Sequence, residues 1–136
     1  MNIDNKHFYK FDFTTEQISQ HFNNAWKDLD IANKDEILDV KFNYAYTAFI
    51  KAGITLLSFY GMKVRSIPGH HVKIIDKIAQ SLDDCAIADM GNIMRSKRNS
   101  DIYAGGIEIT EKECKEYIRF VENVVTRVRE IIFQKE

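Results

Sequence analysis

Glycine and proline are scarce in this sequence. Its 136 residues include six Gly and one Pro, where average usage would give roughly 16 of the two together. A β-sandwich or β-barrel needs many turns, and turns favour these two residue types. The scarcity therefore argues against an all-β fold and favours a few long helices. With 45% hydrophobic and 29% charged residues, the composition is typical of a folded globular chain rather than a disordered one.

The sequence also has little that would direct it to a membrane or to an oxidising compartment. Its two cysteines, Cys85 and Cys114, are too few for a disulfide framework or a structural zinc site, and we expect both to be buried free thiols. Residues 1–11 contain no apolar run of the kind found in secretory signals. The longest uncharged stretch, Ala52–Met62, has eleven residues, whereas a transmembrane helix needs about 20. We therefore expect a cytoplasmic protein that does not bind membranes.

Hydrophobic residues recur at three- and four-residue steps in five segments, and this spacing predicts helices. The segments begin near residues 14, 35, 68, 87 and 110. Two of the starts contain a capping-box pair, Thr14 with Gln17 and Thr110 with Glu113. The second segment is apolar on most sides, which predicts a central helix.

The first thirteen residues are rich in aromatic side chains. Their partial alternation permits a short strand, but no second strand is evident to pair with it, so we expect an arm packed on the helices. The predicted fold class for residues 1–136 is therefore all-α. We expect a single domain, an antiparallel bundle of about five helices with a short aromatic N-terminal arm.

The net charge of −1 produces no overall field that would attract a nucleic acid, so an anion site must come from local clustering. The strongest cluster lies late in the fourth segment. If that segment is helical, Arg95, Asn99 and Tyr103 share one face, with Arg98 beside it. A guanidinium, a carboxamide and a phenol can together hold a phosphate or a base edge. The alternative is a solvated helix with an internal Arg98–Asp101 ion pair.

Two adjacent histidines, His70 and His71, stand at the predicted start of the third helix. Adjacent side chains on a helix point about 100° apart, so the two imidazoles cannot easily share one metal ion. The sequence also contains no zinc signature, phosphate-binding loop or hydrolase motif. We expect no metal and no other cofactor, and an anion-binding or gap-filling role for one of these histidines.

The combination of these segments resembles the HEPN domains, the helical family named for higher eukaryotes and prokaryotes nucleotide-binding. Three features carry the resemblance: Pro68-Gly69-His70-His71 at a helix start, Arg98-Asn99 followed by Tyr103, and the capped last helix. With the long second helix they span about residues 36–133. The resemblance implies a helical bundle that forms a homodimer, with the two motif copies facing a shared cleft.

Many HEPN proteins are metal-independent ribonucleases whose signature is an Arg and a His separated by four to six residues. Arg98 and Asn99 match the start of that signature, but Tyr103 occupies the first position where the His would stand, and no His follows it. A tyrosine titrates near 10 and a histidine near 6.5, so Tyr103 is a poor proton shuttle at neutral pH. His70 or His71 could supply an imidazole from the neighbouring helix.

These observations leave three functions open. The first is a non-catalytic or weakly active HEPN-like module that binds RNA or a nucleotide in the dimer cleft through Arg95, Arg98, Asn99, Tyr103, His70 and His71. The resemblance extends this hypothesis to a toxin–antitoxin, defence or mobile-element system, with a separately encoded nucleotidyltransferase as partner. The second is a ribonuclease toxin that uses Arg98 with an unconventional base. The third is a helical protein-interaction module with no nucleic-acid role.

Overall fold

The computed structural model describes residues 6–103, 105 and 108–134. Within these residues it contains five helices and two short strands, in the order β1 (Phe8–Lys10), α1 (Thr15–Lys34), α2 (Leu38–Phe59), β2 (Met62–Val64), α3 (His70–Ser81), α4 (Cys85–Tyr103) and α5 (Glu111–Ile132). The predicted bundle of about five helices is confirmed. None of the described helices is long and apolar enough to cross a membrane.

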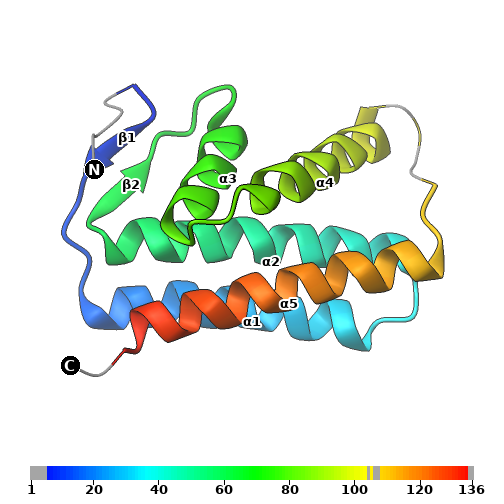
Figure 1. Ribbon diagram of the computed structural model, residues 1–136, viewed down its shortest axis with the longest axis horizontal. Coiled ribbons are helices and arrows are strands. Elements are labelled where there is room, and N and C mark those ends of the chain that lie inside the picture. Colours follow the sequence, from blue (N-terminus) through cyan, green and yellow to red (C-terminus); the bar gives the residue numbers. More distant parts are fainter. Residues whose placement is uncertain (1–5, 104, 106–107, 135–136) are drawn as a thin grey trace.

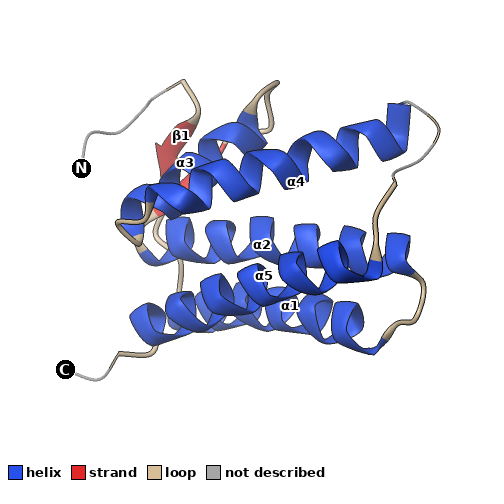
Figure 2. Ribbon diagram, turned by 45° about the vertical axis from the view of Figure 1, so that its right-hand side comes forward, coloured by secondary structure: helices blue, strands red, loops and turns tan. Residues whose placement is uncertain are grey.

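The helices form one layer of three and a second layer of two (Figure 1). Helices α1, α2 and α5 lie side by side, and α3 and α4 pack on α2 on the side away from α1. The turned view in Figure 2 shows the same arrangement, with α3 and α4 above α2 and with α5 and α1 below it. Helix α1 runs antiparallel to α2 and α5, whereas α2 and α5 run in the same direction. The bundle is therefore only partly antiparallel, because the α3–α4 pair lies between α2 and α5 in the chain.

Two helix starts are defined by local hydrogen bonds that the sequence predicts. At α1, the Gln17 backbone N–H donates to Thr14 Oγ1 at 3.1 Å, and the Thr14 N–H donates to Gln17 Oε1 at 2.9 Å. At α5, Thr110 and Glu113 make the same reciprocal pair. Both predicted capping boxes are confirmed, since each satisfies two N–H groups that the first turn of a helix leaves unpaired.

Helix α2 is the centre of the molecule, as its apolar sequence predicts. It contacts α1, α5, α3, α4 and β2, and the buried Asp28 of α1 forms an ion pair of 2.7 Å with Lys51 of α2. Two glycines allow the close approach of the second layer. A Cβ atom at Gly53 of α2 would collide with Ile74 of α3, and one at Gly91 of α4 would lie 2.8 Å from the Phe49 ring of α2.

Part of the N-terminal segment, Phe8–Lys10, forms a strand rather than an arm that only packs on the helices. Strand β1 pairs antiparallel with β2, with Phe8 opposite Val64 and Lys10 opposite Met62. Phe8 is 1% exposed and Met62 is 5% exposed, so this two-stranded sheet is held by apolar side chains buried in the core. The expectation that no partner strand exists was wrong, because a three-residue strand is too short to show a periodic pattern. The small sheet matters for the site because β2 leads directly into the loop that precedes α3.

The turn between α3 and α4 is fixed by an arginine from α5. Arg127 donates from Nη1 to Asp84 Oδ2 at 2.9 Å and from Nη2 to the Leu82 carbonyl at 2.8 Å.

Both cysteines are free thiols, but only Cys114 is buried. The expectation of a buried thiol is wrong for Cys85, because this residue begins α4 at the exposed turn.

Candidate functional site

A cavity of about 360 Å³ lies where the loop before α3, the start of α3 and the later part of α4 meet. Its lining residues are Ser66, Ile67, Pro68, Gly69, His70, His71, Val72, Arg95 and Asn99. Two sequence segments that are separated by more than twenty residues therefore contribute polar side chains to one cavity. Gly69 precedes α3 with φ +84°, a left-handed conformation that glycine adopts without the steric cost of a Cβ atom.

His70 is held by the loop that precedes it. Its ring Nδ1 lies 2.9 Å from the Ile67 carbonyl oxygen, and its backbone N–H donates to the same oxygen at 3.1 Å. Because a carbonyl oxygen can only accept a hydrogen bond, Nδ1 carries the proton. The orientation of the His70 ring is thus set by a backbone group within the same loop.

His71 is held from the opposite side, by Tyr46 of α2. The Tyr46 hydroxyl lies 2.9 Å from His71 Nδ1, and Tyr46 is 1% exposed. Burial raises the pKa of Tyr46 to about 12, although the charges of Arg98 and Arg95 partly oppose the rise. Burial, followed by the charges of nearby cationic groups, lowers the pKa of His71 to about 4. Both side chains are therefore uncharged at neutral pH.

The polar residues of α4 divide between the cavity and the contact with α2. Arg95 and Asn99 line the cavity, and Arg95 Nε donates to Asn92 Oδ1 at 3.3 Å. The Arg98 guanidinium instead lies 5.6 Å from the centre of the Tyr46 ring, within the range of a cation–π contact. The side chain of Tyr103 lies outside the described part of the structure.

The Arg98 and Asp101 side chains, which the alternative interpretation of this segment pairs with each other, both contact α2. Asp101 Oδ2 accepts a hydrogen bond of 3.1 Å from Asn43 Nδ2, while Arg98 covers the Tyr46 ring. Arg98 is thus placed to support the cavity wall rather than to enter the cavity. The physical reason is that α4 lies against α2, so its polar side chains contact residues of α2 instead of pairing with each other within α4.

Tyr46 is the residue of this site that the sequence alone did not reveal. The apolar spacing of the second helix assigns it to the core together with Phe42 and Phe49, and it is indeed buried. The available signal was chemical, because a buried phenol normally needs a hydrogen-bond partner for its hydroxyl group. That partner, His71, is 25 residues away, so no local pattern could have identified it.

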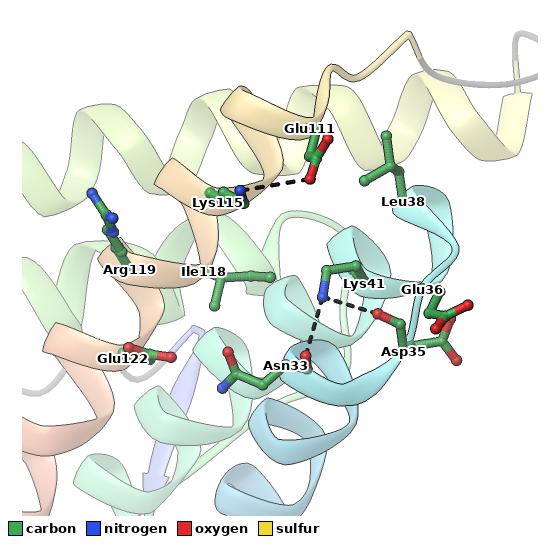
Figure 3. A pocket seen from close by; sticks show the side chains of 10 residues that line it. All are labelled: Asn33, Asp35, Glu36, Leu38, Lys41, Glu111, Lys115, Ile118, Arg119 and Glu122. Carbon is green, nitrogen blue, oxygen red and sulfur yellow. Dashed lines mark hydrogen bonds and ion pairs between the residues drawn. The ribbon is translucent and has the colours of Figure 1, made fainter.

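A larger cavity of about 630 Å³ lies between the α1–α2 turn and α5 (Figure 3). Two of its three cationic groups, Lys41 and Lys115, are engaged in structural contacts. Lys41 Nζ donates to the carbonyl oxygens of Asn33 and Asp35 at 3.2 and 2.9 Å, which secures the end of α1. Lys115 pairs with Glu111 at 3.5 Å. Further carboxylates also line this cavity, which disfavours an anionic ligand, so the smaller cavity is the better candidate site.

Among the described residues, no group of three or more His, Cys, Asp or Glu side chains could hold a metal ion. Comparisons of the chain with models of protein families, with curated proteins and with solved structures give no match.

Proposed function

We propose that this chain is an HEPN-like module that binds RNA or a nucleotide and that the cavity between α3 and α4 holds a phosphate group of the ligand. One observation carries the proposal. Two of the three features that carry the sequence resemblance contribute to one cavity, which is lined by Pro68-Gly69-His70-His71 and by Asn99 of the Arg98-Asn99 pair, together with Arg95. They could have lain on opposite faces of the bundle.

The chemistry of the cavity supports an anionic ligand. Arg95 provides a permanent positive charge, and Asn99 provides a carboxamide that can donate hydrogen bonds. Helix α3 begins at this cavity, and N–H groups in the first turn of a helix favour anions. Arg98 adds a second positive charge nearby, over the Tyr46 ring. So few converging cations predict weak binding with a shallow dependence on salt concentration.

The test is binding of a fluorescein-labelled ten-residue RNA, followed by fluorescence anisotropy during a salt titration. Arg95→Gln should weaken binding by about 1–3 kcal/mol, because it removes a charge-assisted hydrogen bond to phosphate. Arg98→Gln should weaken binding less, because Arg98 contacts the Tyr46 ring and is not among the residues that line the cavity. The matched control is Arg119→Gln, since Arg119 lies on α5 and lines the larger cavity.

Equal affinities of the Arg95 and Arg119 variants would contradict the proposal, as would an affinity of the native protein that does not change with salt. Circular dichroism of each variant shows whether its helices are intact, so that a loss of binding can be assigned to the cavity.

A further inference from the structure

The two adjacent histidines of the cavity have opposite hydrogen-bonding properties. In His70, Nδ1 must carry the proton, because it faces the Ile67 carbonyl oxygen at 2.9 Å. In the neutral ring the other nitrogen, Nε2, therefore has a lone pair and acts as an acceptor. The backbone carbonyl thus selects the tautomer of His70, in the way that a hydrogen bond to one ring nitrogen generally determines the role of the other.

His71 has the opposite tautomer. The hydroxyl proton of the buried Tyr46 needs an acceptor, and His71 Nδ1 lies 2.9 Å away. Since Nδ1 accepts, the proton of the neutral His71 ring is on Nε2, which is a donor. The two rings are 4.6 Å apart, and both residues line the cavity. One acceptor and one donor are therefore presented side by side.

An acceptor at this place is not explained by a phosphate group alone. The phosphate group of a phosphodiester has no O–H proton at neutral pH, so it can only accept hydrogen bonds. It can accept them from Arg95, Asn99 and His71, but it cannot donate one to His70 Nε2. A ligand that displaces water from this nitrogen keeps the hydrogen bond only if it carries a donor next to the phosphate. In RNA the 2′-hydroxyl of the ribose is such a donor, and DNA lacks it.

We infer that His70 is a specificity-determining residue whose Nε2 accepts a hydrogen bond from a ribose 2′-hydroxyl, so that the cavity selects ribonucleotides over deoxyribonucleotides. This inference rests on the proposed function, because it requires that the cavity holds a nucleotide phosphate. An exocyclic amine of a base could also donate to Nε2. The test therefore compares ligands that have the same base and differ only at the 2′ position.

The experiment compares labelled oligouridylate with oligodeoxyuridylate of equal length at pH 8. The native protein should bind the ribo-oligomer about three- to tenfold more tightly, the contribution of one hydrogen bond. An oligomer with 2′-fluoro groups retains a ribose-like substituent but cannot donate. It should bind as weakly as the deoxy-oligomer, and this comparison needs no protein variant.

Two substitutions then locate the effect. In His70→Asn the carboxamide nitrogen can replace Nδ1 and keep the bond to the Ile67 carbonyl, but the acceptor at the Nε2 position is lost. The ratio of the two affinities should fall to about one, as the loss of a single hydrogen bond requires. In His70→Gln the longer side chain can place its carboxamide oxygen near the Nε2 position, so this variant should retain part of the preference.

The outcomes distinguish a failure of the inference alone from a failure of the proposed function as well. Equal binding of the ribo-, deoxy- and 2′-fluoro-oligomers by the native protein would overturn the inference, while Arg95-dependent binding would still support a phosphate site. A preference that survives in His70→Asn would also overturn it. Failure of the native protein to bind any of the oligomers would overturn both.

Discussion

The hydroxyl of Tyr46 and Nδ1 of His71 lie 2.9 Å apart and join the centre of α2 to the start of α3. The Arg98 guanidinium covers the same tyrosine ring from α4, at 5.6 Å from its centre. One buried phenol thereby contacts both helices of the second layer. The pair is uncharged at neutral pH, because the pKa of Tyr46 is about 12 and that of His71 is about 4.

Stability should decrease as the pH falls from about 6.5 to about 4, because the pKa of His71 is lowered from 6.5 to about 4 in the folded protein. Across this window the unfolded chain binds a proton on His71 that the folded chain does not, so protonation favours unfolding. The decrease should be absent above the window and complete below it. Urea unfolding at a series of pH values measures it, with His71→Gln as the comparison. Burial also lowers the pKa of His21, but its effect on the pH dependence of stability is the same in the native protein and in His71→Gln. Identical pH profiles for the two would contradict the assignment.

Tyr46→Phe should lower the free energy of unfolding by about 1 kcal/mol, because it leaves the half-buried His71 Nδ1 without its donor. Tyr44→Phe is the matched control, since Tyr44 lies on the same helix with its side chain exposed, and its effect should be near zero. Chemical denaturation measures both values. Equal stabilities of the two variants would show that the hydrogen bond contributes nothing to the fold.

Gly53→Ala should destabilise the contact between α2 and α3. The added methyl group would collide with Ile74 and lie 2.8 Å from Ile78 Cδ1, and both isoleucines are fully buried. Overpacking of this kind costs about 1–3 kcal/mol, which outweighs the gain of up to about 1 kcal/mol from the higher helix propensity of alanine. Thermal unfolding measures the change. The control is Ser96→Ala at an exposed position of α4, and a Gly53→Ala protein as stable as this control would refute the predicted clash.

We expect no robust cleavage of RNA at pH 7. Attack by a 2′-hydroxyl needs a base for its proton and an acid for the leaving 5′-oxygen. His71, with a pKa of about 4, is not an imidazolium at this pH, and a phenol stands at position 103. Incubation of the purified protein with total RNA tests this expectation. Degradation that is abolished in His70→Asn would show that it is wrong and would identify His70 as the base.

We predict a homodimer, on the strength of the HEPN resemblance. The large number of apolar residues in so small a bundle gives the prediction less support, because Leu57, Val125 and Val128 are buried within one chain. Phe59 remains 40% exposed and Trp26 remains 46% exposed. Sedimentation at micromolar concentration should show twice the chain mass of 15.9 kDa. A single species of 15.9 kDa would contradict the prediction.

The helices, their order and two of their starts could be predicted from the sequence because the interactions that define them are local. Thr14 with Gln17 and Thr110 with Glu113 are three residues apart, and a helical stripe repeats every three or four residues. The clustering of Arg95 and Asn99 on one face of α4 also follows from helical spacing alone.

The tertiary structure decided the remaining features, because they depend on contacts between residues far apart in the chain. Phe8 finds its strand partner at Val64, and Tyr46 finds its acceptor 25 residues later. Gly53 and Gly91 let α3 and α4 pack closely on α2, and the packing of these helices brings His70 and His71 beside Arg95 and Asn99. The sequence determined which polar groups are available, whereas close packing determined which of them meet and, through Tyr46 and the Ile67 carbonyl, which ring nitrogen of each histidine carries its proton.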